Sequence, residues 1–407
     1  MSEWKEVSLS EMGKTITGKT PSSQYPEDFG DEMPFITPSD SFEKKYINKS
    51  DRFLSRSGSD RLKEKIISPN SIMVTCIGSA MGKVAKNSLS SVTNQQINSI
   101  IVNENFDSDY IYYLLKNNYA VLRNAASGST AIPILNKTDF DNLRFKVELN
   151  LNEQRKMVSI LSTIDDKIET NNQINQELEA MAKTLYDYWF VQFDFPDQNG
   201  KPYKSSGGKM VYNPELKREI PEGWGVEKLE NIANITMGQS PKGTSYNEVG
   251  EGMLFFQGST DFGWRFPVAR QYTTEPSRIA EEDDILLSVR APVGTLNIAD
   301  TRCCIGRGLA AINSKGGANS YIFNVMQDFK KLFDMMNSVG TTFGSITKDD
   351  LYSLQLVYPP NELLMKFDQS VKPFDREIKN RSRQNQELTQ LRDWLLPMLM
   401  NGQVKVE

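Results

Sequence analysis

The chain has 407 residues, with 47 Lys and Arg against 52 Asp and Glu and a formal net charge of −5. This length allows two or three domains, and a hydrophobic content of 38% is typical of globular proteins. Histidine is absent, which excludes His-based catalytic triads and His-ligated zinc sites. Cys76, Cys303 and Cys304 form no CxxC pair, so the sequence predicts neither a disulfide framework nor a metal site.

Nothing in the sequence predicts export or membrane insertion. The opening residues, MSEWKEVSLSEM, lack the basic region and apolar run of a secretory signal. No stretch approaches the roughly 18 consecutive apolar residues that a membrane span requires. Together with the few unpaired cysteines, these features predict a protein of the cytoplasm.

An internal duplication organises the chain. Trp4 and Leu9 recur as Trp224 and Leu229, at an offset of 220 residues. Further on the offset shrinks, and the tetrapeptide that begins at Asn175 returns unchanged at an offset of 210. A repeat this long is not a solenoid, so we expect two copies of one structural unit.

Each copy begins with short β-branched and aromatic runs separated by Gly, Pro, Asn and Ser, and ends in a helical pattern. We therefore expect an α+β fold, with two pseudo-symmetric strand-rich domains joined by two long helices. The predicted boundaries are a first domain at 1–150, a helix at 151–190, a linker at 191–223, a second domain at 224–357, a helix at 358–400 and a tail at 401–407.

Both predicted helices carry a heptad stripe, with a polar interruption at the same place. The two stripes predict that the helices pair antiparallel; the alternative is that each packs only on its own domain. Pro373 should kink the second helix or delay its start. The residues expected to pair are Leu161, Ile164, Ile168, Asn175, Leu178 and Leu185 in the first helix and Val371, Phe374, Ile378, Asn385, Leu388 and Leu395 in the second.

Two catalytic motifs match only formally. Residues 13–20 spell the phosphate-binding pattern GxxxxGKT, but Pro21 disfavours the helix that must follow, and the second copy replaces Lys19 with Gln239. Pro196-Asp197 with Glu215 and Lys217 fits a metal-dependent nuclease pattern, yet these residues lie in the predicted linker. The sequence therefore predicts no catalytic residue, metal or cofactor of its own.

The sequence does contain cationic and amide side chains that could bind a polyanion such as DNA. Between Lys44 and Lys65 eight cations face three acids, although a solvated basic surface explains such a run equally well. Arg can grip guanine, and Gln can read adenine. The candidates in the first copy are Lys19, Thr20, Lys44, Lys45, Arg52, Arg56, Lys83, Gln95, Gln96 and Ser129. Those in the second copy are Gln239, Lys242, Gln257, Trp264, Arg265, Arg290, Arg307 and Thr341.

The order and duplication of these features resemble the specificity subunits of type I restriction-modification systems. The resemblance covers nearly the whole chain and rests on three features: the repeated Trp-x4-Leu start, the Gly-x-x-Pro turns at Gly18 and Gly238, and the paired Asn-Gln-Glu-Leu helices. A further match is the connector from Gly200-Lys201-Pro202-Tyr203 to Gly223-Trp224.

The resemblance implies two target-recognition domains that each read one half of a split site in double-stranded DNA. It also implies two methyltransferase subunits, which bind S-adenosylmethionine, and separate motor-nuclease subunits. The two helices would set the separation of the domains, and the chain itself would not be an enzyme. Two alternatives stay open: a self-contained nuclease or methyltransferase, and a coiled-coil adaptor that does not bind DNA.

Overall fold

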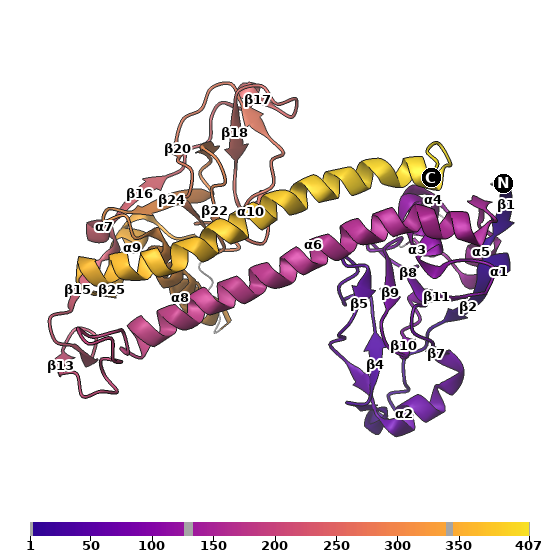
Figure 1. Cartoon of the computed structure of the whole chain (residues 1–407), viewed down its shortest axis with the longest axis horizontal. Helices are drawn as coiled ribbons and strands as arrows, with labels where there is room; N and C mark the ends of the chain where they lie inside the picture. The colour runs from indigo at the N-terminus through magenta and orange to yellow at the C-terminus, as the bar shows by residue number, and fades with distance from the viewer. Residues whose placement is uncertain (1–2, 126–132, 339–344, 407) are drawn as a thin grey trace. The chain divides into compact units, whose positions relative to one another are not determined.

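The computed structural model describes residues 3–125, 133–338 and 345–406. It divides into two compact units: unit 1 comprises Met1–Thr170 and Asn385–Glu407, and unit 2 comprises Asn171–Gln384. Each unit holds one strand-rich domain and a segment of each of two long helices, α6 (Leu151–Tyr186) and α10 (Asn361–Met400) (Figure 1). A π-helical turn, Asp187–Val191, continues α6.

The domain of unit 1 is built from short strands because Gly, Pro, Asn and Ser interrupt its apolar runs every few residues. Its two five-stranded sheets have the orders β2-β11-β8-β9-β5 and β3-β6-β4-β10-β7, and β1 pairs with β12. The strands are β1 (Trp4–Ser8), β2 (Gly13–Thr17), β3 (Phe29–Gly30), β4 (Met33–Ile36), β5 (Tyr46–Ile47), β6 (Phe53–Leu54), β7 (Ile66–Ile67), β8 (Ile72–Thr75), β9 (Val84–Asn87), β10 (Ser91–Thr93), β11 (Ile97–Val102) and β12 (Arg144–Glu148). The helices are α1 (Leu9–Met12), α2 (Arg56–Arg61), α3 (Ser108–Asn117), α4 (Tyr119–Asn124) and α5 (Lys137–Asn142).

The domain of unit 2 repeats this plan. Its sheets have the orders β16-β24-β21-β22 and β17-β19-β18-β23-β20, and β15 pairs with β25. The strands are β15 (Gly225–Lys228), β16 (Ala233–Met237), β17 (Tyr246–Asn247), β18 (Met253–Phe256), β19 (Tyr272–Thr273), β20 (Ile279–Ala280), β21 (Ile285–Ser288), β22 (Leu296–Ile298), β23 (Cys303–Ile305), β24 (Leu309–Ser314) and β25 (Gln355–Tyr358). The helices are α7 (Leu229–Ile232), α8 (Asn319–Ser338) and α9 (Lys348–Tyr352).

The strand orders of the two domains match one for one, apart from β5 at the edge of unit 1. In both, one strand pair of the second sheet is parallel: β4 with β10, and β18 with β23. The turn after the first strand is held by the same bond, from Leu9 N to Leu143 O at 3.0 Å and from Leu229 N to Leu354 O at 2.8 Å. The predicted α+β duplication is confirmed.

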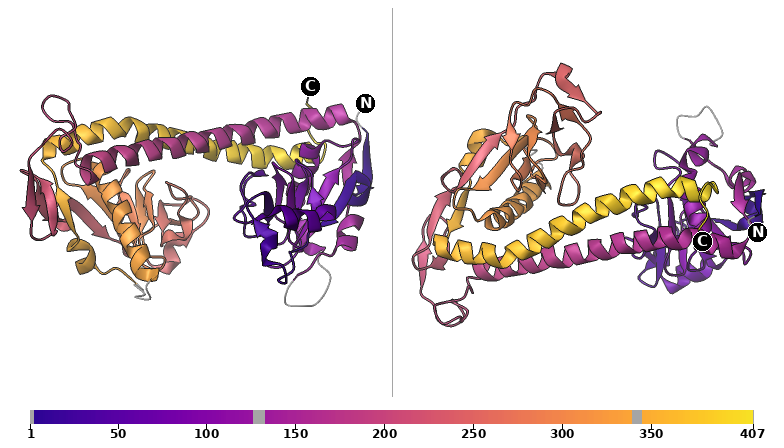
Figure 2. Two further views of the ribbon diagram at one scale, coloured as in Figure 1. Left: turned by 90° about the horizontal axis from the view of Figure 1, so that it is seen from below. Right: turned by 45° about the horizontal axis from the view of Figure 1, so that its top comes forward.

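Segments of α6 and α10 run antiparallel within each unit, because each unit contains the start of one helix and the end of the other. They lie side by side in all the views of Figures 1 and 2. In unit 1, Leu161 and Ile164 are buried, and Leu395 packs on the same core. In unit 2, Val371 and Ile378 are buried. The other stripe residues are buried or half-buried: Ile168, Asn175, Leu178, Leu185, Phe374, Asn385 and Leu388.

The polar interruption of the stripes forms a paired layer in unit 2. The Nδ2 of Asn171 donates to Oε1 of Gln384 at 2.8 Å, and its Oδ1 accepts from Nη1 of Arg381 at 3.0 Å. Asn175 donates to the hydroxyl of Ser382 at 3.4 Å. Because a buried amide is costly without partners, this layer favours a single register of the two helices. The alternative that each helix packs only on its own domain is wrong.

Pro373 does not delay the second helix. α10 begins at Asn361 and stays helical through Pro373 to Met400. The proline removes one backbone donor from the helix interior, but packing of neighbouring residues such as Val371 and Ile378, both 1% exposed, supports the helix on either side. The expectation of a late start was wrong because tertiary burial outweighs this local preference.

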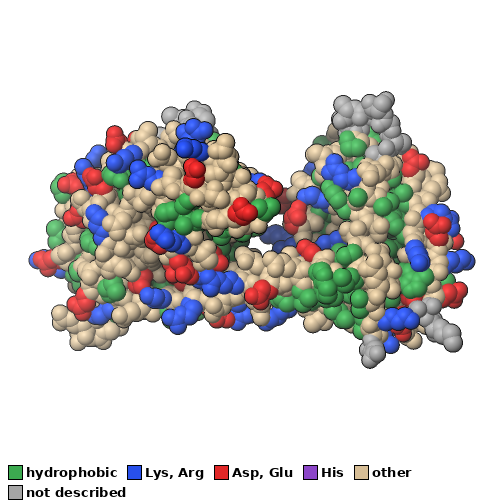
Figure 3. Space-filling model, turned by 90° about the horizontal axis from the view of Figure 1, so that it is seen from above, with side chains coloured by type: hydrophobic (Ala, Val, Ile, Leu, Met, Phe, Trp, Pro, Cys, Tyr) green, Lys and Arg blue, Asp and Glu red, His purple; other side chains and the backbone are tan. Residues whose placement is uncertain are grey.

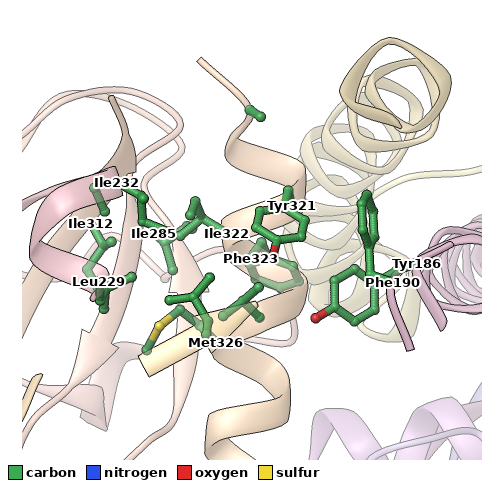
Figure 4. Packing of buried hydrophobic residues seen from close by; sticks show 14 of the residues in the cluster. Tyr186, Phe190, Leu229, Ile232, Ile285, Ile312, Tyr321, Ile322, Phe323 and Met326 are labelled. Carbon is green, nitrogen blue, oxygen red and sulfur yellow. The ribbon is translucent and has the colours of Figure 1, made fainter. Parts of the chain in front are cut away.

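The segment between α6 and β15 is structured. It contains the hairpin of β13 (Met210–Asn213) and β14 (Arg218–Pro221), and Ile220 packs with Phe193 and Val357. Phe195 stacks on the rings of both Tyr203 and Trp224, with centroids 4.6 and 5.1 Å apart. The connector therefore belongs to the packed body of unit 2. Figure 4 shows the adjoining core, where residues of α8 lie between the sheet and the end of α6.

The two catalytic motifs that match only formally also lack the structure that phosphate binding or metal-dependent cleavage would need. β2 covers Gly13–Thr17 and leads into a loop and a 3₁₀ turn, Pro26–Asp28, where a phosphate-binding motif needs a long helix. The Asp197 carboxylate accepts the backbone N–H groups of Asn199 and Lys201, each at 2.8 Å, and so closes a turn. Within the described residues, no group of three or more Cys, Asp and Glu side chains is placed to hold a metal ion. In the same residues, no helix combines the length and apolarity of a membrane span.

Candidate nucleic-acid interface

Four loops of unit 2 meet at one end of its sheets: residues 238–241, 257–259, 289–294 and 306–308. We call this the four-loop edge. Backbone hydrogen bonds join the loops to one another and to the strand ends. Gln239 N donates to Ile305 O at 3.0 Å, Gly306 N to Phe256 O at 2.8 Å, and Val289 N to Gly308 O at 2.9 Å. Exposed loops on such a fixed frame are typical of binding surfaces.

Unit 1 has the same edge, formed by residues 18–21, 37–39, 76–82 and 94–96. The corresponding bonds run from Lys19 N to Thr93 O at 2.9 Å, from Asn94 N to Ile36 O at 3.0 Å and from Cys76 N to Gln96 O at 2.7 Å. Each of the three bonds therefore has a partner at the matching position of the other unit. The backbone of the edge is duplicated together with the sheets.

The repeated glycines Gly18 and Gly238 let the loops approach. A Cβ on Gly18 would lie 2.2 Å from the carbonyl oxygens of Asn94 and Thr93, and a Cβ on Gly238 would lie 2.2 Å from that of Gly306. No real Cβ tolerates such a distance, so these positions require glycine for close contact. The Gly-x-x-Pro turns noted in the sequence thus shape the edge.

In unit 2 the edge surrounds a concavity of about 420 Å³ that brings together three of the predicted residues: Gln257, Arg290 and Arg307. The amide of Gln257 is held by the Ser240 hydroxyl at 2.9 Å. Both arginines are exposed, and within the described residues neither guanidinium has an acidic partner. The lining residues include no Asp or Glu, so the concavity favours an anionic ligand with hydrogen-bond acceptors. Its other lining residues are Gly258, Ser259, Thr260, Ser288, Ala291, Pro292 and Gly308.

In unit 1 the same places carry different side chains. Gln95 occupies the position of Arg307. Ile77 occupies the position of Arg290, since each of these two residues forms an isolated bridge at a matching place, Ile77 with Ile134 and Arg290 with Ser345. The Thr20 hydroxyl donates to Oε1 of Gln95 at 2.6 Å, and Lys19 is exposed beside them. Gln96 accepts from the Asn94 side chain at 3.0 Å. This edge therefore offers an amide and a single cation, where unit 2 offers two guanidinium groups.

The remaining predicted cations lie away from these edges or have partners. Lys44 pairs with Glu169 at 3.0 Å, Lys83 with Glu43 at 2.6 Å and Lys242 with Glu275 at 3.8 Å. Arg52 stacks on the Phe29 ring at 4.0 Å, Arg56 is exposed at the start of α2, and Trp264 is 50% exposed. Figure 3 shows Lys and Arg interspersed with Asp and Glu on the face in view. Ser129 and Thr341 lie outside the described residues.

Lys45 was predicted to contact DNA, and the structure contradicts this. Its side chain is 9% exposed, and its ammonium lies 3.0 Å from Asp109 of α3 and 2.9 Å from the Ser162 hydroxyl of α6. Lys86, which is 1% exposed, binds the same carboxylate. Burial raises the pKa of the Asp109 carboxyl, but the hydrogen bonds and charges of Lys86 and Lys45 outweigh it and hold the pKa below its usual value.

Arg265 is likewise buried, so its predicted place on an exposed loop is wrong. Its side chain is 6% exposed, and it donates to Glu179 of α6 at 3.0 Å and to Asp375 of α10 at 2.7 Å. The guanidinium stacks on the Phe323 ring at 3.8 Å. Burial raises the pKa of Asp375, and the charge of Arg265 offsets only part of that rise. Two of its three nitrogens, Nη1 and Nη2, thus bind carboxylates of the long helices.

Sequence reasoning missed two acids of the long helices that accept bonds from cations, Asp165 and Asp375. Asp165 of α6 accepts from Arg392 at 2.9 Å and from the Tyr113 hydroxyl at 2.6 Å. Asp375 holds the corresponding place in α10, because the offset of 210 that aligns the heptad stripes also aligns these two residues. Asp165 and Asp375 each directly follow a residue of the heptad stripe. Their shared offset of 210 was the signal in the sequence that could have revealed them.

The chain is similar in sequence and in fold to specificity subunits of type I restriction-modification systems. A family model described as the type I restriction modification DNA specificity domain matches residues 1–180 and 221–390. A Methanocaldococcus jannaschii protein assigned as the type I restriction enzyme MjaX specificity subunit is 33% identical over 307 residues, 73% of this chain and 68% of the relative. The MjaIX specificity subunit of the same organism is 28% identical over 431 residues, covering 100% of this chain and 94% of its own.

Among solved structures, the type I restriction-modification S subunit from M. genitalium matches with a TM-score of 0.60 at 17% identity. The match covers 98% of this chain and 96% of that one. At this level of identity the similarity concerns the fold alone.

Proposed function

Because the chain belongs to the family of type I restriction-modification DNA specificity domains, we propose that it recognises a split site in double-stranded DNA and directs methyltransferase subunits to it. One observation carries the proposal: the same four-loop edge occurs in both units with different side chains. Two copies of one frame, each presenting its own donors, suit a ligand that is read in two halves.

The chemistry of each edge matches what a major groove offers. A guanidinium can bind O6 and N7 of guanine, and a Gln amide can bind N6 and N7 of adenine. We assign Arg290, Arg307 and Gln257 to one half-site and Lys19, Thr20 and Gln95 to the other. Arg52, Arg56 and Lys242 are exposed and serve as phosphate contacts in this proposal.

The chain contributes recognition, and its partners contribute catalysis. We propose that two methyltransferase subunits supply the S-adenosylmethionine site, and that motor-nuclease subunits join them for restriction. With a net charge of −5, the chain leaves most phosphate neutralisation to these partners. Their target is cellular DNA, and the proposed location is the cytoplasm.

Matched apolar positions on the two helices support docking of two similar partners. Met181 of α6 is 52% exposed and Leu391 of α10 is 43% exposed, and the offset of 210 relates one to the other. Trp394, at 58%, lies one turn beyond Leu391. Exposed apolar side chains at equivalent places suit two copies of one methyltransferase subunit. The double substitution Met181→Glu and Leu391→Glu should prevent that assembly in size-exclusion chromatography.

Methylome sequencing of a host that expresses the chain with its methyltransferase subunits tests the proposed function. We expect methylation at a single bipartite sequence with a fixed spacer. Exchanging residues 1–150 for those of another family member should change one half-site and leave the other intact. Methylation without any sequence preference would favour an adaptor, and methyl transfer by the chain alone would favour a self-contained enzyme.

The helix pair gives a second test, because its length should set the spacer. One turn of duplex is about 34 Å long, and at about 1.5 Å per residue the 36 residues of α6 and the 40 residues of α10 extend over about 54 and 60 Å. Inserting one heptad into both α6 and α10 in register should lengthen the spacer while both half-sites stay the same. An unchanged spacer would overturn this part of the proposal. Fluorescence anisotropy at physiological salt should show weak DNA binding by the isolated chain and tight binding by the complex.

A further inference from the structure

Lys45 and Arg265 occupy the same position in the two units. The offset of 220 that relates the starts of the two copies relates these residues. Their carbonyl oxygens accept matching backbone bonds, from Lys86 N at 2.7 Å in unit 1 and from Ile298 N at 2.9 Å in unit 2. Each cation thus lies beside the second strand of an equivalent hairpin, β8–β9 or β21–β22.

Both cations connect the domain of their unit to the long helices. Lys45 reaches Ser162 of α6, and its second partner, Asp109, lies in α3. Arg265 reaches Glu179 of α6 and Asp375 of α10. The same Asp375 accepts the hydroxyl of Ser320, in the first turn of α8, at 2.7 Å. In unit 1 the polar cluster therefore joins the domain and its core helix to α6, and in unit 2 it joins them to both α6 and α10.

Stability alone does not account for a charge at this junction. Withdrawing a cation from water is costly, and apolar side chains of similar size often stabilise a buried position as well or better. A guanidinium that binds two carboxylates on two different helices does impose a direction, because its donors form a rigid planar fork. A buried cation at both junctions therefore suits control of orientation.

A small change in the angle at such a junction displaces the recognition loops by a distance comparable to the rise of a base pair. A domain of this size has a radius of gyration of about 15 Å. A tilt of about 13° at its base moves atoms about 15 Å from the base by about 3.4 Å, which is the rise of one base pair, and loops farther out move more. The angle at which each domain meets the helices can therefore select the spacer to within a base pair.

We propose that Arg265 and Lys45 are positioning residues, which fix the angle of each recognition domain on the helix pair and so determine which spacer length is accepted. This inference rests on the proposed function. It assigns both residues to spacer selection, whereas their charge had suggested contact with DNA. Asp375 and Glu179, and Asp109 and Ser162, are their partners in that role.

The experiment measures methylation by the complete complex of the chain with its methyltransferase subunits. A plasmid library carries the two half-sites, taken from the methylome of the parent chain, separated by spacers one or two base pairs shorter or longer. For Arg265→Met we expect both half-sites to be retained, while the preference for the parent spacer over its neighbours falls several-fold. Lys45→Met should have the same effect, and Glu179→Gln, which leaves the bond to Asp375, a smaller one.

Arg302→Met is the matched control, because Arg302 is 60% exposed and its one ion pair among the described residues is with Glu281 on the surface of the same unit. It should keep the parent spacer preference. A uniform loss of methylation at all spacers for both Arg265→Met and the milder Glu179→Gln would indicate a purely structural role and overturn the inference. A changed half-site would indicate DNA contact and overturn it as well. If the parent chain itself showed no bipartite site, the proposed function would fail first.

Discussion

The two four-loop edges have the same backbone and different chemistry. Three loop hydrogen bonds and one closely packed glycine recur in both units, yet Gln95 stands where unit 2 has Arg307. The junctions with the helices follow the same rule, with Lys45 where unit 2 has Arg265. The difference teaches that main-chain bonds and glycines maintain the frame, so that side chains can vary on it without loss of the fold.

The largest effect should come from breaking the frame itself. Gly238→Ala places a Cβ 2.2 Å from the carbonyl oxygen of Gly306, so the loops must separate. We expect the free energy of unfolding of unit 2 to fall by about 3 kcal/mol, measured by calorimetry on the full chain. Gly258→Ala is the control, because its Cβ would meet no atom within 4 Å and its φ of −168° is extended. If Gly238→Ala and Gly258→Ala had the same melting temperature, the close approach of the loops would not contribute to the stability of unit 2.

The junction of unit 1 should be sensitive to acid. Asp109→Asn leaves Lys86 buried without its carboxylate, which should cost about 3 kcal/mol at neutral pH. Because the pKa of Asp109 is held below 3.8, its stabilisation is complete above that pH and is lost as the pH falls through the lower folded value. Melting temperatures of the two chains should therefore differ at pH 7 and converge in acid. A difference in melting temperature that stayed the same at every pH would mean that the asparagine amide disturbs packing, and that the lost charge is not the cause.

A smaller effect should follow from giving unit 2 the side chain of unit 1. Arg307→Gln should change the preferred base at one position of one half-site from guanine to adenine, a discrimination of about 2 kcal/mol. The other half-site should not change. Methylome sequencing of the host measures this, with Arg302→Gln as the control on the same domain. A half-site that stays the same would limit Arg307 to a phosphate contact.

The smallest effect concerns the single cation at the edge of unit 1. Lys19→Gln reproduces Gln239 of the second copy and removes one charge. We expect binding by the complex to weaken equally for all DNA sequences, and the dependence of log K on log salt to become shallower by about one unit. Lys5→Gln, on β1, should leave that slope unchanged. A shift in sequence preference would assign Lys19 to base reading.

The duplication and the helix stripes could be predicted from the sequence because they depend on spacing alone. Residues repeated at offsets of 220 and 210 must occupy equivalent places whatever the fold. The matching strand orders could not be predicted, since two-residue strands such as β3 and β7 give no periodic signal. Pairing between such strands depends on contacts distant in sequence.

The candidate site could be predicted only in part, because charge does not report exposure. Arg290, Arg307 and Gln257 do line one concavity, as their chemistry suggested. Arg265 has the same local character, next to Gly263 and Trp264, yet it is buried against carboxylates from other elements. The acids that neutralise it are 86 and 110 residues away along the chain. No local pattern distinguishes a cation with such a partner from one without.

The amide layer formed by Asn171, Asn175, Arg381 and Gln384 has a mechanical consequence. If either helix slid along the other by a turn, these groups would lose the hydrogen bonds that they make in the present register. Slippage is therefore penalised, and the pair resists compression and extension along its axis. Any deletion in only one of the two helices must be absorbed as local distortion, because the layer prevents the other helix from shifting to compensate.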